Sequence, residues 1–407
     1  MRPTRAPSMS KLLAPALFCA VLAALHSNAD AQSISSTARA LQAVNGEAAY
    51  DNKIPPGVRA LLTQLKHQLR DLIQKTLDES VSARTPPGVV HARVLAALRR
   101  EGVSTGGPKD DVHTFGSITD LDITRPRGHP DLLAATTNVS VHCGTDGSLY
   151  LFRRVGARWR LVLAEEANGY EDVSGAQGRF DFRVSPPDAR GRFFVVTADV
   201  NPWCTSFWQA LRFRVLRVGT DAYRPRVVSR GEDGIYLGTA LEGFRLYSTA
   251  STFTLRFDGA QDLDPGLLVR PHVLKFSVVG NSAVRVAPVA FSPQDFADEW
   301  LHMPWEEAAR WSEPSRLSEL KRWHEALNAS GKGFYADEIL FVQPCGRRAR
   351  EWQIGVATVA DDAAARVPAK LYFTVAREGG ALIMRGVGDA RPPGCPGESP
   401  VSYGGVD

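Results

Sequence analysis

Arginine and aromatic side chains are interleaved along the middle of the chain, and this pattern suits the binding of anionic ligands. One group surrounds Trp159, and a second follows Trp203 and Trp208. An arginine fork binds carboxylates and phosphates at two points, whereas a flat indole face stacks on a sugar ring or receives a cation. The sequence therefore predicts a binding surface formed by Arg160, Arg212, Arg214, Arg226, Trp203, Trp208 and Tyr170.

The same pattern has a simpler explanation that involves no ligand. In a half-buried sheet, alternation places charged side chains on the outer face and aromatic side chains in the core. Glu165 and Glu166 would then be ion-pair partners of the arginines. Both interpretations stay open at the level of the sequence.

A cluster of acids in the loop AEEANGYEDVSG suggests a second kind of chemistry. It contains Glu165, Glu166, Glu171 and Asp172 directly after an expected strand. Glycoside hydrolysis requires two carboxyl groups roughly 5–10 Å apart. A hydrolase that acts on polysaccharide is therefore the alternative function, although acids in a connecting loop are also commonly solvated. No catalytic residue is assigned.

Sequence-local motifs of other enzyme and metal classes are absent. There is no GxSxG, HExxH, Walker-type loop or GxGxxG. The acids Asp258, Asp262 and Asp264, and the pair Asp120 and Asp122, offer oxygen ligands for calcium, but aspartate at such places also forms turns. We predict neither a metal site nor a cofactor.

The first residues are typical of a secretory signal peptide. Basic Arg2, Arg5 and Lys11 lead into LLAPALFCAVLAAL and then into small residues, which predicts cleavage after Ala31. The apolar run is too short for a confident membrane span, and no later segment approaches the roughly 20 apolar residues that a span needs. A secreted or periplasmic protein is expected, with a lipid anchor at Cys19 as a minor alternative.

The charge balance gives no support for nucleic-acid binding. The chain has 48 basic and 44 acidic residues, and the predicted signal peptide removes three basic side chains and Asp30. The mature protein would therefore carry a net charge of about +2, whereas nucleic-acid-binding proteins concentrate a marked positive excess on one face.

Four cysteines remain after signal cleavage: Cys143, Cys204, Cys345 and Cys395. An even number in an exported chain indicates disulfides, with three possible pairings. The segments TTNVSVHC and TADVNPWC resemble each other, which suggests equivalent strand ends in a duplicated unit. This similarity favours a bridge between Cys143 and Cys204 and leaves Cys345 to pair with Cys395.

Hydrophobic periodicity predicts the order of the structural elements. After a polar lead-in, apolar residues at helical spacing follow Pro56 and again Pro87, with Thr85 available as a cap and Gly102 as a stop. These helices should pack as a hairpin on the sheet that follows. Short segments rich in Val, Phe, Tyr and Thr then run without intervening helices, which predicts antiparallel meanders.

The fold class expected is mainly β, antiparallel, as propeller-like or repeated sheets, with an N-terminal helical hairpin and a C-terminal α+β part. The middle section has room for about four propeller blades. The last four strands form either a sheet of their own or a continuation of the preceding sheets. The predicted sections are a signal peptide (1–31), a helical segment (32–107), a β domain with an internal repeat (108–290) and an α+β segment (291–407).

Together these observations favour an exported soluble protein that binds without catalysing a reaction. The expected partner is an acidic polymer of the cell envelope or another envelope protein. The sequence shows no features of a nucleic-acid-binding protein or of a transmembrane protein.

Overall fold

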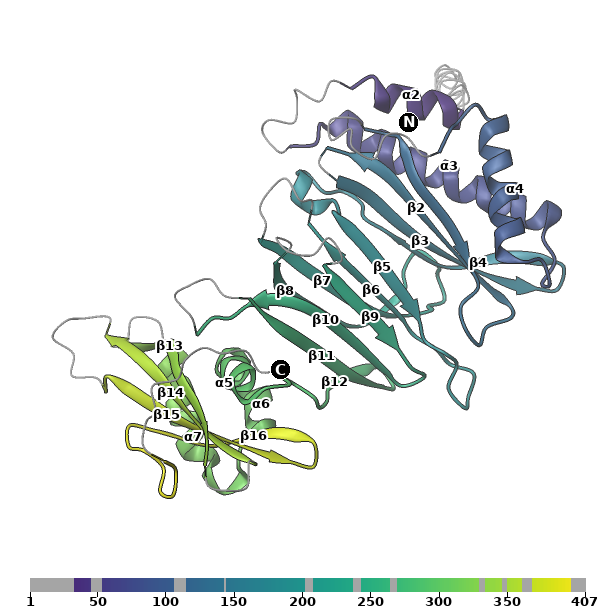
Figure 1. The fold of residues 1–407 in the computed structure, drawn as a ribbon. Helices are drawn as coiled ribbons and strands as arrows, with labels where there is room; N and C mark the ends of the chain where they lie inside the picture. The colour runs from purple at the N-terminus through teal and green to yellow at the C-terminus, as the bar shows by residue number, and fades with distance from the viewer. Residues whose placement is uncertain are drawn as a thin grey trace, which may run out of the picture.

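The computed structural model arranges the chain as a row of layers, with helices at one end and a separate α+β part at the other (Figure 1). Most of the structure is antiparallel β-sheet, as the sequence predicts. No helix among the described residues is long and apolar enough to cross a membrane. The predicted signal peptide lies outside the described residues, which are 33–44, 53–105, 115–142, 144–201, 208–236, 243–263, 269–328, 334–345, 350–360 and 368–396.

The first layer consists of helices α2 (Ile34–Gln42), α3 (Pro56–Ser80) and α4 (Pro87–Arg100). Proline occupies the first turn of both α3 and α4, where its missing N–H would have no intrahelical partner. Leu65, Leu69 and Ile73 form a fully buried stripe on α3 that packs in one core with the first sheet. The two predicted helices and their position on the sheet are confirmed.

Two local expectations about this layer are wrong. The expected polar lead-in contains α2, whose Ile34 and Leu41 are buried and whose N-cap Ser33 accepts a hydrogen bond from the Ser36 amide at 3.2 Å. Thr85 does not cap α4, because Pro86 occupies the N-cap position. The Thr85 hydroxyl instead accepts a hydrogen bond from the Ser82 amide at 2.9 Å.

Three four-stranded antiparallel meanders follow the helices. The first sheet comprises β1 (Ile118–Thr124), β2 (Leu132–Val141), β3 (Gly144–Val155) and β4 (Arg158–Glu166). The second comprises β5 (Arg179–Val184), β6 (Val195–Val200), β7 (Trp208–Arg217) and β8 (Arg226–Tyr236). The third comprises β9 (Phe244–Ser248), β10 (Thr252–Ala260), β11 (Val269–Val279) and β12 (Ser282–Arg285).

Alternation along the strands buries both faces of the first two sheets. Leu133 of β2 faces the helices, whereas its neighbour Leu132 packs in the core shared with the second sheet. On β6, Val195 contacts that same core and Val196 contacts the core shared with the third sheet. The three sheets therefore stack face to face, because successive side chains of a strand point to opposite faces.

The repeated sheets agree with the expected fold class, but their number is lower than expected. Within the described part of the chain, three sheets rather than about four occupy the region from Ile118 to Arg285 before the next helices begin. Strands β2 and β6 carry the two similar segments, and each is the second strand of its sheet. The cysteines that end those segments, Cys143 and Cys204, lie outside the described residues.

The C-terminal part has its own sheet and core. Helices α5 (Pro293–His302), α6 (Trp305–Ala308) and α7 (Leu317–Asn328), with short 3₁₀ turns η3 (Ala309–Trp311) and η4 (Pro314–Arg316), pack on one four-stranded meander. Its strands are β13 (Phe334–Pro344), β14 (Glu351–Ala360), β15 (Lys370–Glu378) and β16 (Ala381–Gly388). Of the two arrangements that the sequence allowed, the separate sheet is therefore the one observed.

The tryptophans of the C-terminal helices lie in this core or pack against it, with Trp305 and Trp323 only partly buried. Trp300 is fully buried, and Trp311 is buried in the same cluster. The predicted bridge between Cys345 and Cys395 is present and ties the end of β13 to the segment after β16.

Removal of the N-cap of α5 tests how this helix begins. The Ser292 hydroxyl accepts a hydrogen bond from the Asp295 amide at 3.0 Å, and Pro293 occupies the first turn. We expect Ser292→Ala to lower the free energy of unfolding by about 1 kcal/mol, because an amide loses its partner. Chemical denaturation measures this change, and Ser292→Asp should restore the stability. An unchanged midpoint in Ser292→Ala would contradict the assignment.

Candidate functional site

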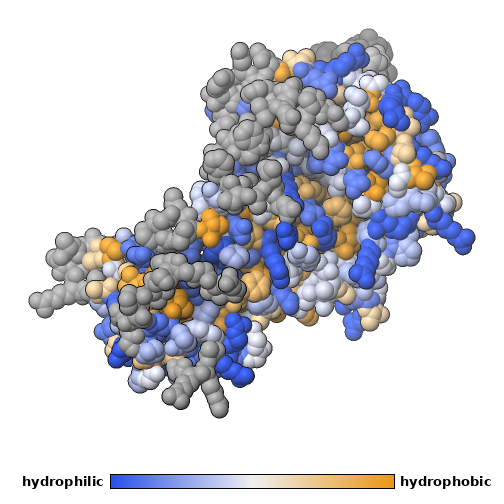
Figure 2. All heavy atoms as spheres, in the orientation of Figure 1, coloured by the Kyte–Doolittle hydropathy of each residue, from blue (hydrophilic) through white to orange (hydrophobic). Residues whose placement is uncertain are grey.

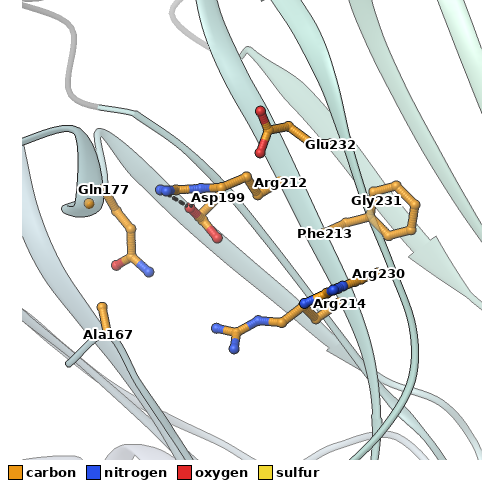
Figure 3. A pocket seen from close by; sticks show the side chains of 10 residues that line it. Ala167, Gln177, Asp199, Arg212, Phe213, Arg214, Arg230, Gly231 and Glu232 are labelled. Carbon is orange, nitrogen blue, oxygen red and sulfur yellow. Dashed lines mark hydrogen bonds and ion pairs between the residues drawn. The ribbon is translucent and has the colours of Figure 1, made fainter. Parts of the chain in front are cut away.

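A cleft of about 530 Å³ lies where the second sheet meets the segment that leads into it. Figure 3 shows arginine and acidic side chains of β6, β7 and β8 on one side, with Ala167 and Gln177 opposite them. We call this the arginine cleft. Its lining residues are Ala167, Gly175, Gln177, Asp199, Arg212, Phe213, Arg214, Arg230, Gly231 and Glu232.

Strand alternation explains why the charged residues share one face of the second sheet. On β7, Leu211, Phe213 and Val215 pack toward the third sheet. Arg212 and Arg214 therefore point to the opposite face, which is the face toward the first sheet. Register pairs Arg212 with Glu232 and Arg214 with Arg230 across to β8. On this side of the molecule, hydrophilic and hydrophobic residues are accordingly interspersed over the stacked sheets (Figure 2).

Arg212 is fixed by several hydrogen bonds. Its Nε donates to Asp199 Oδ2 at 2.8 Å, and its Nη groups donate to the carbonyl oxygens of Ser174 and Ala176 at 3.3 and 3.1 Å. Burial raises the pKa of Asp199, and the neighbouring Arg212 opposes this rise. The pair thus anchors the segment around Gly175 to the second sheet.

Arg214 forms an ion pair with Glu165 at the end of β4. The Glu165 side chain is buried, whereas Arg214 is only partly covered, and its burial lowers the pKa of the guanidinium. Beside it, Arg230 is exposed and has no ion-pair partner among the described residues. The cleft therefore presents one restrained guanidinium and one unpaired guanidinium to solvent.

A second cleft of about 570 Å³ adjoins the first, and Arg214 lines both. We call it the Tyr223 cleft; it is lined by His67, Arg70, Ala164, Glu165, Glu166, Asn168, Arg214, Tyr223, Arg224, Pro225 and Val227. Arg70 of α3 lies 4.8 Å from the centre of the Tyr223 ring. The same arginine reaches Glu166 at 3.5 Å. Helix α3 thereby contributes charged residues to a site that is otherwise formed by strands and loops.

A buried ion pair fixes the segment between the two clefts. Lys66 Nζ donates to the two Asp146 carboxylate oxygens at 3.1 and 2.9 Å and also to the carbonyl oxygen of Ala167. The Tyr170 hydroxyl donates to Asp146 Oδ2 at 2.7 Å. Burial raises the pKa of Asp146, and Lys66 opposes this effect. Helix α3, strand β3 and the loop after β4 are therefore joined at one point.

The structure places the predicted binding residues in different surroundings. Arg212 and Arg214 line the arginine cleft, and Tyr170 is partly buried and packs against Gly175. Trp208 lies on β7 with its ring 4.9 Å from that of Tyr236 and lines neither cleft. Arg160 and Arg226 are exposed and also lie outside the residues that line the two clefts. Trp203 lies outside the described residues.

Sequence reasoning missed several members of the site. Asp199 is a single acid within an apolar strand. That position is the sequence signal that could have identified it as a buried polar residue. His67 and Arg70 lie on α3 outside its buried apolar stripe, and nothing in the local sequence links them to the strands. Gln177, which accepts a hydrogen bond from the Gly147 amide at 2.7 Å, carries no sequence signal.

The loop acids do not gather as one group. Glu165 pairs with Arg214, and Glu166 contacts Arg70. Glu171 is exposed and lies 3.5 Å from Arg59, while Asp172 caps a short 3₁₀ turn (η2, Val173–Gly175). Glu165 and Glu166 both line the Tyr223 cleft, but each of the two carboxylates is paired with an arginine.

One other acidic group has a ligand-like arrangement, formed by Asp262, Asp298 and His302. Asp298 already accepts hydrogen bonds from the Leu263 amide at 2.8 Å and from Arg270 at 2.6 Å. Of the aspartates considered for calcium, Asp262 belongs to this group. The others do not: Asp258 lies on β10, Asp120 and Asp122 lie on β1, and Asp264 is outside the described residues.

Comparison with known proteins gives no family for this chain. No family model matches it, and no curated protein matches it. Among solved structures, an Ntf2-like protein involved in plasmid conjugation is similar at 10% identity and a TM-score of 0.15, covering 52% of this chain and 79% of that one. Levansucrase from Bacillus subtilis is similar at 7% identity and a TM-score of 0.14, covering 65% and 86%. Levansucrase from B. megaterium is similar at 9% identity and a TM-score of 0.15, covering 77% and 94%.

Proposed function

We propose that the protein is an exported, non-catalytic binding protein of the cell envelope that holds an acidic polymer in the arginine cleft. The observation that carries this proposal is the row of guanidinium groups on one face of β7 and β8, where Arg230 has no ion-pair partner among the described residues. A planar fork with fixed N–H groups binds a carboxylate or phosphate at two points.

The acidic side chains of the cleft suit the remainder of such a ligand. Glu232 is exposed beside Arg212, and Asp199 lines the same cleft. Carboxylates accept hydrogen bonds from hydroxyl groups. A sugar polymer with anionic groups offers both partners, namely anions for the arginines and hydroxyls for the acids.

The pairing of the carboxylates favours binding over hydrolysis. Glycoside hydrolysis uses one carboxyl group as an acid and another as a base or nucleophile. Glu165, Glu166 and Asp199 are each held by an arginine instead. Export is supported by the signal-like N-terminus and by the disulfide, since disulfides persist in oxidising compartments.

A binding assay with polygalacturonate, a soluble acidic polysaccharide, tests this function. We expect the oxidised mature protein to bind polygalacturonate and not to bind neutral dextran. Arg230→Ala should weaken binding about tenfold, because one charge-assisted contact is worth roughly 1.5 kcal/mol. Added salt should weaken binding further by screening the charges.

Arg226→Ala is the matched control, because Arg226 is an exposed arginine on the same strand that lines neither cleft. We expect this variant to bind like the wild type. An equal loss of affinity in Arg230→Ala and Arg226→Ala would show that binding depends on the overall positive charge of the surface and not on the arginine cleft. Release of reducing ends over time would replace the binding proposal with the hydrolase, and no retention of polygalacturonate would reject the acidic-polymer ligand.

A further inference from the structure

The two clefts share a wall, and that wall is Arg214. On one side of Arg214 lie Arg212 and Arg230, and on the other lie Tyr223 and Arg224. We infer that the clefts are two successive subsites of one groove, which takes a linear acidic oligosaccharide with Arg214 at its centre. This inference rests on the proposed function and specifies its ligand.

The size of the groove indicates more than one sugar unit. The clefts measure about 530 and 570 Å³, and each alone lies within the roughly 300–1,000 Å³ typical of a pocket for one small molecule. Val227 of β8 lines the Tyr223 cleft, and Arg230 of the same strand lines the arginine cleft. Three residues of a strand rise roughly 10 Å, so a ligand that extends from Val227 to Arg230 is longer than a single sugar ring.

The chemistry of the two subsites differs. The arginine cleft offers charged partners, whereas the second cleft adds an aromatic ring, Tyr223, whose side chain is 54% exposed. The negative face of an aromatic ring attracts the weakly positive C–H groups of a sugar. Arg70 lies over the Tyr223 ring at 4.8 Å and holds it in place. The ring therefore contacts sugar carbons while Arg224, at the same rim, reaches an anionic group.

Arg214 can serve both subsites without losing its protein partner. A guanidinium has five N–H donors, and the Glu165 ion pair involves the Nη2 group. Glu165 thus acts as a positioning residue that fixes the guanidinium of Arg214, which lines both clefts. A ligand carboxylate bound there does not need to displace Glu165.

The chain-length dependence of binding tests this inference. Titration calorimetry with galacturonate oligomers, from the monomer to the hexamer, should show affinity that rises with length and then levels off once both clefts are filled. Tyr223→Ala should lower the affinity for the hexamer about tenfold and leave that for the shortest oligomers unchanged. Arg214→Ala should lower the affinity for every length, and Arg214→Lys should restore little of it, because an ammonium lacks the planar fork.

The matched control is Tyr247→Ala, since Tyr247 is 51% exposed and lines neither cleft. It should bind every oligomer like the wild type. Equal affinity at all lengths, or an equal loss for short and long oligomers in Tyr223→Ala, would overturn the two-subsite groove while leaving the proposed function intact. Failure of the wild type to bind any oligomer would reject the proposed function and this inference together.

Discussion

Replacement of Glu299 by alanine is expected to lower the free energy of unfolding by about 3–5 kcal/mol. Glu299 is buried on α5 and accepts hydrogen bonds from Arg270 of β11 at 2.7 Å and from Arg285 of β12 at 2.6 Å. Both arginines are themselves buried. Without Glu299, the ion-pair partners left among the described residues are Glu307 for Arg285 and Asp298 for Arg270. The buried positive charge is then undercompensated.

Acid should weaken the same interaction in the wild type. Burial alone would raise the pKa of Glu299, but Arg285 and Arg270 outweigh it, and the net pKa lies below the ordinary value of 4.5. A carboxyl group with a lowered pKa stabilises the fold above its unfolded pKa and loses this contribution as the pH falls through its folded pKa. Stability should therefore fall below about pH 4.5, and Glu299→Gln should lack this part of the decline.

Chemical denaturation at several pH values measures both effects. Glu325→Ala is the control, because Glu325 is an exposed acid on α7 whose partner Lys321 lies 3.6 Å away. An exposed pair of this kind contributes roughly 0–1 kcal/mol. If Glu299→Ala lowered the free energy of unfolding by no more than Glu325→Ala does, the buried network would not join the C-terminal part to the third sheet.

Replacement of Lys66 by methionine is expected to cost about 3–5 kcal/mol and also to weaken ligand binding. Lys66 is 1% exposed and Asp146 is fully buried, so the variant leaves a buried carboxylate without its cation. The pKa of Asp146, already raised by burial, should rise further. The Ala167 carbonyl also loses its donor, and the segment that lines both clefts loses an anchor.

The double variant Lys66→Met, Asp146→Leu distinguishes the effect of an unpaired buried carboxylate from the effect of a lost anchor on the segment around Ala167. Replacing a buried pair by apolar side chains is often neutral for stability, so most of the lost free energy of unfolding should return. Binding should stay weak, because Ala167 and Tyr170 still lack their partners. Lys75→Ala on the exposed face of α3, where Lys75 lies 4.0 Å from Glu79, is the surface control. Wild-type stability in the Lys66→Met single variant would refute the anchoring role.

Local patterns in the sequence predicted most of the secondary structure. The three- and four-residue steps of Leu62, Leu65 and Leu69 predicted α3, and strand alternation predicted the antiparallel meanders. These patterns work because helix and strand periodicity are properties of neighbouring residues. Helix α2 was missed because two of its four buried positions are Thr37 and Ala38, whose small side chains carry little apolar signal.

The candidate site was predictable only in part. Arg212 and Arg214 were singled out by their alternation with apolar residues, and both line the cleft. The same alternation also selected Arg160 and Arg226. Alternation shows that a side chain points away from the core, but it does not show which groups surround that side chain. The sequence also left open whether Glu165 forms an ion pair with an arginine. The structure shows that it does and that the partner is Arg214.

The sequence by itself determined most of the elements and their order, and it favoured the pairing of Cys345 with Cys395 that the structure contains. Only the tertiary structure decided that Glu165 of the first sheet meets Arg214 of the second, and that Lys66 of α3 meets Asp146 of β3. Such contacts depend on which apolar faces stack against each other and in what register. That choice is the sum of many weak packing contacts between distant segments, so no short stretch of sequence encodes it.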